Sequence, residues 1–133
     1  MPMVSPMQRR ARRGKLNDIA GRMAEDWAAG HYEAGGAAVL ARRHRNGAGE
    51  IDIVARDGRE IVFCEVKRVS RPLDGSPPVS KRQLARLGAA AEAYLLTHRA
   101  ETGEEPPCRF DVALVGRDGI GHILRNAHSF DTV

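Results

Sequence analysis

Two acids and a lysine that could support metal-dependent chemistry lie in two neighbouring apolar runs. Glu65 and Lys67 are separated by one residue in the run IVFCEVK, and Asp52 lies between two isoleucines in the run EIDIV. Side chains alternate between the two faces of a strand, so Glu65 and Lys67 would point the same way. E-x-K alone is most simply a solvated ion pair. Acidic residues within apolar strands need a compensating partner, however, and the whole arrangement favours a functional site.

A tight turn between the two runs would bring these residues together. The dipeptide Asp-Gly at 57–58 is preferred in two-residue hairpin turns. If it forms the turn, Asp52 is a diagonal neighbour of Glu65, and Glu50 lies directly opposite Glu65. Like charges placed in this way destabilise a sheet unless a cation lies between them. The hairpin therefore predicts a cation site.

The residue types at this site suit a hard divalent cation. Carboxylate oxygens with open coordination positions favour Mg²⁺ or Mn²⁺ over zinc, and we expect Asp52, Glu65 and Glu50 to be ligands. Such a cation supports hydrolysis of phosphodiester bonds. Lys67 would orient the attacking water or stabilise the charge that develops on the phosphate.

The elements that must position these residues are predicted in the order α-β-β-β-α-β-β. An apolar stripe of Leu16, Ile19, Ala20, Met23, Ala24, Trp27 and Ala28 predicts a first helix that ends near Gly30. Ser80 and Gln83 form a capping-box pattern at the start of a second helix, after a proline-rich loop at 70–79. Strands are expected at 39–44, 50–56, 61–67, 109–115 and 120–124. This order predicts the α/β class, with a mixed sheet flanked by helices.

Length and composition indicate one domain. The chain has 133 residues, enough for a single core, and we expect a domain at 15–133 preceded by a flexible basic arm at 1–14. No apolar run is long enough to span a bilayer. The two cysteines lack metal-ligand spacing and are expected to be buried thiols in a reducing compartment. A cytoplasmic protein without a membrane partner is expected.

The positive charge predicts binding to a phosphate backbone. The net charge is +4, and the cations cluster at 9–15 and at 42–45. Few aromatic residues are available for base stacking, so backbone contacts are favoured. A solubilising arm is the alternative for the first cluster. We expect Arg43, Arg45, Arg68 and Lys81 to contact nucleic acid.

The two runs that carry Asp52, Glu65 and Lys67 resemble a known nuclease core. GEIDIVARDG at 49–58, followed by IVFCEVK at 61–67, resembles the PD-(D/E)xK nuclease superfamily. More narrowly, the chain resembles the bacterial YraN family, which is similar to archaeal Holliday junction resolvases. Further matching motifs are GRMAE at 21–25, Val79 with Lys81 and Arg82, AYL at 93–95, RFDV at 109–112 and NAHSF at 126–130.

The resemblance implies a restriction-endonuclease-like fold and a Mg²⁺-dependent endonuclease acting on DNA, with branched DNA as a candidate substrate. It implies Asp52, Glu65 and Lys67 as the site triad and adds Glu25 of the first helix. On an ideal helical wheel Glu25 lies opposite the apolar stripe, so by itself it would face solvent. The resemblance also implies a homodimer, because two strand cuts need two sites.

Two departures from the family pattern leave roles open. Family members follow E-V-K with a short polar residue and an arginine, whereas this chain has Arg68-Val69-Ser70-Arg71. Lys81 and Gln83 are both candidates for the site, although a capping role is favoured for Gln83. The main alternative function is a non-catalytic nucleic-acid-binding module that keeps the nuclease fold. A third possible function is a metal-dependent enzyme acting on another phosphate ester, or a protein-interaction domain.

Overall fold

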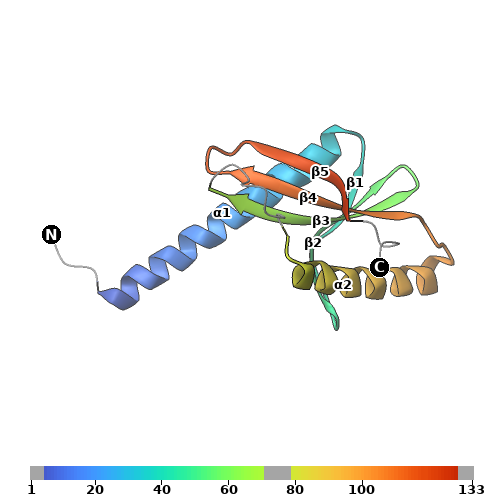
Figure 1. Cartoon of the computed structure of the whole chain (residues 1–133), viewed down its shortest axis with the longest axis horizontal. Helices are drawn as coiled ribbons and strands as arrows, with labels where there is room; N and C mark the ends of the chain where they lie inside the picture. Colours follow the sequence, from blue (N-terminus) through green and yellow to red (C-terminus); the bar gives the residue numbers. More distant parts are fainter. Residues whose placement is uncertain (1–4, 71–78, 129–133) are drawn as a thin grey trace.

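The computed structural model describes residues 5–70 and 79–128, and it confirms the predicted mixed α/β class and element order. Within these residues a five-stranded sheet is flanked by two helices (Figure 1). Of the loop predicted at 70–79, residues 71–78 lie outside the described residues. The elements are α1 (Pro6–Ala34), β1 (Ala38–Asn46), β2 (Gly49–Asp57), β3 (Glu60–Val69), α2 (Lys81–Thr102), β4 (Cys108–Gly116) and β5 (Gly121–His128).

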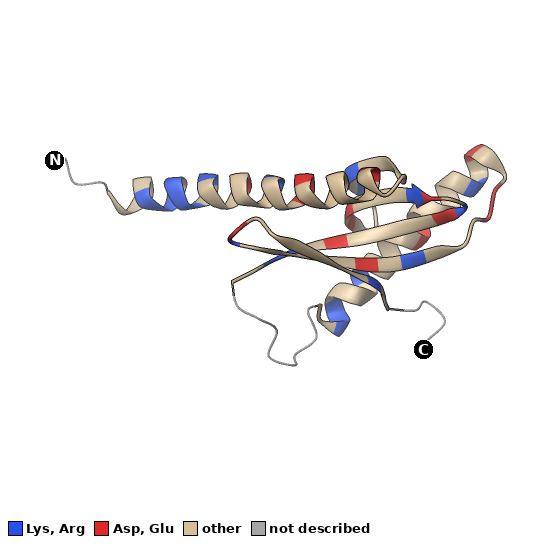
Figure 2. Cartoon of the chain, turned by 90° about the horizontal axis from the view of Figure 1, so that it is seen from above, with Lys and Arg blue, Asp and Glu red and all other residues tan. Residues whose placement is uncertain are grey.

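The strands lie side by side in chain order, β1-β2-β3-β4-β5. Only β3 and β4 are parallel, because α2 carries the chain across the sheet between them; the other neighbours are antiparallel. The two helices cover opposite faces (Figures 1 and 2). Ala28, Ala29 and Tyr32 of α1 pack on one face, and Leu87 and Ala90 of α2 pack on the other. This burial of apolar surface is the main stabilising term.

Helix α1 begins earlier than its apolar stripe predicted. The Ser5 side chain accepts a hydrogen bond from the Gln8 amide, the Gln8 side chain accepts one from the Ser5 amide, and Pro6 occupies the first helical position. Residues 6–14, which we expected to form an arm, are therefore the first turns of α1. The predicted capping box between Ser80 and Gln83 at the start of α2 is confirmed.

The predicted buried stripe of α1 is wrong in its first half. Ala24 and Ala28 are buried as expected, but Leu16, Ile19 and Met23 are exposed. The reason is that the N-terminal part of α1 projects past the ends of the strands (Figure 1), which leaves these side chains largely uncovered. Neither described helix is long and apolar enough to cross a membrane.

The hairpin between β2 and β3 turns one residue later than predicted. Asp57 pairs with Glu60, so the turn residues are Gly58 and Arg59. Gly58 has φ of 63°, which suits a turn with glycine at its first central position, whereas we had expected Asp-Gly at the centre. The shift changes every opposed pair along the two strands.

Both cysteines are free thiols. Cys64 is buried in the core on the α1 face, as expected, whereas Cys108 at the start of β4 is only partly buried. Burial raises the pKa of Cys64 to about 12, so this thiol stays protonated at neutral pH.

Candidate functional site

The candidate site lies where β2 and β3 stop pairing. The last backbone pair is Ile53 with Cys64, and the next residues along the two strands are Asp52 and Glu65. Beyond this point the hairpin of β1 and β2 turns away from β3 (Figure 1). One Asp52 oxygen accepts a hydrogen bond from the Val66 backbone amide at 2.8 Å. The Asp52 side chain thus gives this amide of β3 a partner at the point where β2 and β3 stop pairing.

Asp52 and Glu65 are brought into contact by the observed register. Continuing it by one residue places them directly opposite each other instead of diagonally, and it moves Glu50 away from its predicted place opposite Glu65. The two carboxyl groups are close enough for the charge of Asp52 to raise the pKa of Glu65. Both residues are half-buried. The correction of the turn therefore makes the acidic pair closer than the sequence had predicted.

Burial and mutual repulsion make this pair hard to ionise fully. Burial, followed by the charge of Asp52, raises the pKa of Glu65 to about 7, although the nearby Lys67 ammonium opposes the shift. Burial also raises the pKa of Asp52, against the favourable Val66 hydrogen bond. Glu65 therefore keeps its proton up to about pH 7. A divalent cation is the natural replacement for that proton.

The other two predicted acids lie near the pair, but each has its own arginine. The charges of Glu25 and Glu50 both raise the pKa of Asp52. Glu25, whose side chain is only 13% exposed, accepts a hydrogen bond from Arg43 Nε at 2.8 Å, so its expected solvent-facing position on the helical wheel is wrong. Glu50 is 3.6 Å from Arg45. Among residues 5–70 and 79–128, no three His, Cys, Asp or Glu side chains form a metal cage.

Arg43 has an unusual backbone at this place. Its φ is 51°, in the left-handed region that non-glycine residues rarely adopt. It lies on the edge strand β1 between Arg42 and His44, whose partners on β2 flank Asp52. The hydrogen bond to Glu25 and the charge of Glu25 raise the pKa of Arg43, and the opposing effect of burial is smaller. The ion pair therefore compensates for a strained backbone beside the acidic pair.

Two predicted nucleic-acid contacts lie elsewhere on the surface. Arg68 is exposed near the end of β3 and, by strand alternation, points to the face opposite Lys67. It lines a groove of about 590 Å³ between α1 and the ends of β3 and β4. Lys81 is exposed at the first position of α2. The structure does not bring Arg68 to the acidic pair.

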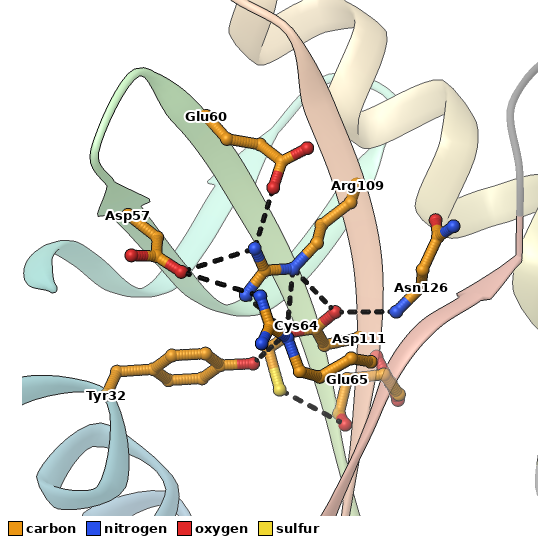
Figure 3. Close-up of polar contacts among 9 residues, drawn as sticks. Tyr32, Asp57, Glu60, Cys64, Glu65, Arg109, Asp111 and Asn126 are labelled. Carbon is orange, nitrogen blue, oxygen red and sulfur yellow. Dashed lines mark hydrogen bonds and ion pairs between the residues drawn. The ribbon is translucent and has the colours of Figure 1, made fainter. Parts of the chain in front are cut away.

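A buried polar network on the α1 face was not predicted as part of the site (Figure 3). The fully buried Asp111 of β4 accepts hydrogen bonds from the Tyr32 hydroxyl at 2.6 Å, from the Asn126 amide at 2.9 Å and from Arg109 Nε at 3.1 Å. Arg109 also contacts Glu60 at 2.6 Å. Two charged residues in the otherwise apolar segment RFDVALV were the only sequence signal.

The network fixes protonation states as well as positions. Burial, followed by contacts with Cys64 and Asp111, raises the pKa of Tyr32 far above its usual range, so the phenol remains a donor. Burial alone would lower the pKa of Arg109, but its bonds to Asp111 and Glu60 raise it, so the guanidinium remains charged. The network ties α1 to β4, β5 and the β2–β3 turn.

The fold and this geometry define a mixed α/β protein with a half-buried carboxyl pair and a lysine at a fork in its sheet. The chain belongs to the family described as "Uncharacterised protein family UPF0102", whose model matches residues 24–115. The family-level relation to YraN proteins that the motifs predicted is thereby confirmed.

Relatives cover nearly the whole chain. A UPF0102 protein of Cereibacter sphaeroides is 42% identical over 110 residues, which are 83% of this chain and 91% of the relative. One from Ruegeria pomeroyi is 40% identical over 121 residues, 91% of this chain and 97% of the relative. One from Azorhizobium caulinodans is 39% identical over 132 residues, 98% and 95% of the two chains.

The raised pKa of Glu65 predicts that the metal-free protein loses stability as the pH rises. The unfolded chain loses this proton near pH 4.5, whereas the folded chain keeps it to about pH 7. The free energy of unfolding should therefore fall between these values, by roughly 2 kcal/mol once the partial exposure of Glu65 is allowed for. Urea unfolding in EDTA from pH 4.5 to 7.5 measures this fall. Glu65→Gln should flatten it, whereas Glu92→Gln on the exposed side of α2 should not. If the free energy of unfolding fell equally with pH in wild type and Glu65→Gln, the raised pKa of Glu65 would be contradicted.

The Tyr32–Asp111 hydrogen bond predicts a stability loss from a single hydroxyl. Tyr32→Phe leaves a buried carboxylate with one donor fewer, which should lower the free energy of unfolding by about 1–3 kcal/mol. Tyr94→Phe is the matched control, because within the described residues no carboxylate accepts a hydrogen bond from the Tyr94 hydroxyl. Denaturant unfolding at pH 7 compares the two. A loss no larger for Tyr32→Phe than for Tyr94→Phe would show that the network does not hold α1.

Proposed function

We propose that the chain is a cytoplasmic Mg²⁺- or Mn²⁺-dependent endonuclease with a restriction-endonuclease-like fold, which hydrolyses phosphodiester bonds in DNA. The observation that carries this proposal is the register that places Asp52 opposite Glu65 at the fork of β2 and β3, where the charge of Asp52 raises the pKa of Glu65. Lys67 is close enough to lower the pKa of Glu65. The sequence resemblance to junction resolvases supports branched DNA as the preferred substrate.

The donor set fits Mg²⁺ or Mn²⁺. These cations keep several water ligands and need only one or two protein carboxylates, so a pair without a third acid is compatible with them, whereas a structural zinc site is not. Asp52 and Glu65 would hold the cation. Glu50 and Glu25 would act by charge unless they separate from their arginines. When bound, the cation supplies Lewis-acid activation of the phosphoryl group and lowers the pKa of a water.

Lys67 and the Val66 amide would have different roles beside the cation. Lys67 lies on the same face as Glu65, one residue away along β3, where its ammonium can hydrogen-bond a phosphate oxygen or position the attacking water. The Val66 amide fixes the orientation of the Asp52 carboxyl at 2.8 Å. Water-poor surroundings strengthen both interactions, because each residue is partly buried.

Positive charge around the site suits a phosphate backbone. Arg43 and Arg45 on the edge strand β1 lie beside the fork, and each can exchange its carboxylate for a phosphate. The N-terminal half of α1 adds a second cationic region, with Lys and Arg side chains concentrated towards its free end (Figure 2). No acidic residue lies between positions 6 and 17.

One observation favours the alternative, a non-catalytic nucleic-acid-binding module. Glu25 and Glu50 are ion-paired with arginines instead of completing a set of ligands with Asp52 and Glu65. A binding surface alone, however, gains nothing from a carboxyl pair whose ionisation is unfavourable and which would repel phosphates. A single experiment that measures both metal binding and DNA cleavage distinguishes the two functions.

Variants at the fork should separate metal binding from cleavage. Asp52→Asn should lose both the Mn²⁺ heat measured by calorimetry and the cleavage of DNA, whereas Lys67→Gln should keep metal binding and lose cleavage by roughly 10²-fold or more. Wild type should release protons on binding Mn²⁺ at pH 6.5, because the cation replaces the proton on Glu65. Titrations in two buffers of different ionisation enthalpy count those protons.

The substrates for that experiment are branched, flapped and linear DNA, and Arg99→Gln at the far end of α2 is the matched control. Unchanged metal binding in Asp52→Asn would refute the site. Metal binding without cleavage of any of the three DNAs would establish the binding module in place of the nuclease.

The cations of α1 predict a salt dependence. Arg10→Gln combined with Arg13→Gln removes two positive charges and keeps the helix, so the slope of log affinity for DNA against log salt should decrease by roughly 2. The control pair, Arg59→Gln with Arg99→Gln, removes the same charge from the hairpin turn and the end of α2. An equal change of slope for both pairs would show that net charge, and not α1, sets the affinity.

A further inference from the structure

An uncovered seam runs along α1 at positions that alternate three and four residues apart. This is the spacing that two paired helices present to each other. Every one of these side-chain positions is exposed, although α1 is the longest helix of the described chain. The positions are Arg9, Arg12, Leu16, Ile19, Met23, Asp26 and Gly30.

The centre of the seam is apolar. Leu16, Ile19 and Met23 are 65%, 52% and 64% exposed. Leu16 and Met23 also border the 590 Å³ groove beside α1. The turn between β4 and β5 lines the same groove through Arg117 and Gly119, and its Ile120 is 71% exposed. Contiguous large apolar side chains of this kind mark an interaction surface, because their exposure to water is unfavourable.

Opposite charges flank the apolar centre of the seam. Arg12 lies four residues before Leu16, and Asp26 lies three residues after Met23. Figure 2 shows the same asymmetry along the whole helix, with basic residues towards the N-terminus and acidic ones further along. Asp26 contacts Arg42 of its own chain, but its side chain remains 65% exposed and can accept a second cation.

We propose that this seam binds a second copy of the chain, with the two α1 helices antiparallel about a two-fold axis near Ile19. In that arrangement Ile19 meets Ile19 of the partner subunit, and Leu16 meets Met23 of the partner subunit. Arg12 meets Asp26 of the partner subunit at each end. A parallel arrangement would instead place Arg12 against Arg12 of the partner subunit, which is repulsive. The seam is therefore self-complementary in one orientation only.

Other occupants fit the seam less well. DNA would gain nothing from three exposed aliphatic side chains, and Asp26 would repel its phosphates. An anionic membrane would accept the apolar centre and Arg12 but would also meet Asp26. A second α1 satisfies the apolar centre and both charged ends together.

Sedimentation equilibrium in EDTA without DNA tests the assembly. Wild type should be a dimer, and Ile19→Asp, which places a charge at the two-fold axis, should raise the dimer dissociation constant by about 100-fold or more. Leu96→Asp is the matched control, because Leu96 is 62% exposed on α2 and lies outside the seam; it should remain dimeric. Circular dichroism confirms that each variant folds. A monomeric wild type, or an Ile19→Asp dimer as tight as wild type, would overturn the proposal.

Cysteine cross-linking tests the orientation. Under mild oxidation, Ile19→Cys should cross-link to itself, whereas Leu16→Cys should cross-link only when mixed with Met23→Cys. The native chain, which carries Cys64 and Cys108, is the control. Efficient self-cross-linking of Leu16→Cys would indicate parallel helices and refute the antiparallel seam. Wild type that stays monomeric but binds vesicles of anionic phospholipid through Leu16 and Met23 would assign the seam to a membrane.

This inference is separate from the nuclease activity. The assembly is measured without metal or DNA, so a protein that dimerises through α1 but cuts no DNA would refute only the proposed function. A monomer that cuts DNA would refute only the seam.

Discussion

The buried carboxylate of Asp111 is the interaction on which the arrangement of α1 depends. It is fully buried on β4 and is neutralised by Arg109 and by donors from α1 and β5. A buried carboxylate that lost these donors would be strongly destabilising, so α1 must dock with Tyr32 against β4. Tyr32 follows Glu25 by two helical turns, so both lie on the same side of α1. Docking of Tyr32 therefore also holds Glu25 close to Asp52.

Electrostatic balance at the fork follows from this docking. Glu25 and Glu50 each have an arginine, but within residues 5–70 and 79–128 Asp52 and Glu65 are stabilised only by the Val66 amide and the nearby Lys67 charge. The unfavourable charge is thus concentrated on one pair, while its neighbours are neutralised. A proton or a cation can relieve that pair without a rearrangement of the surrounding ion pairs. This is why the outer acids need not be ligands for the inner pair to bind a metal.

Local patterns predicted more of this structure than long-range ones. The element order, both strands of the hairpin and the Ser80 cap depend on neighbouring residues, and they were confirmed. The hairpin register was wrong because Asp57-Gly58 and Gly58-Arg59 are both acceptable turns, and the ion pairs of Arg109 with Asp57 and Glu60 favour the second. The burial of α1 was wrong because helical periodicity does not show where a sheet ends. The Asp111 network joins segments far apart in the chain, so no local pattern could reveal it.

The continuity of α1 connects the two proposals. One uninterrupted helix carries Glu25 and Tyr32 at the sheet and the seam around Ile19 beyond it. Because α1 is one continuous helix from Pro6 to Ala34, a partner bound at the seam would also set the orientation of the Asp52–Glu65 pair relative to that partner. Two copies paired about Ile19 would present their Asp52–Glu65 pairs in a two-fold arrangement. Such an arrangement would suit a DNA substrate with two equivalent strands to cut, because each subunit would face one of them.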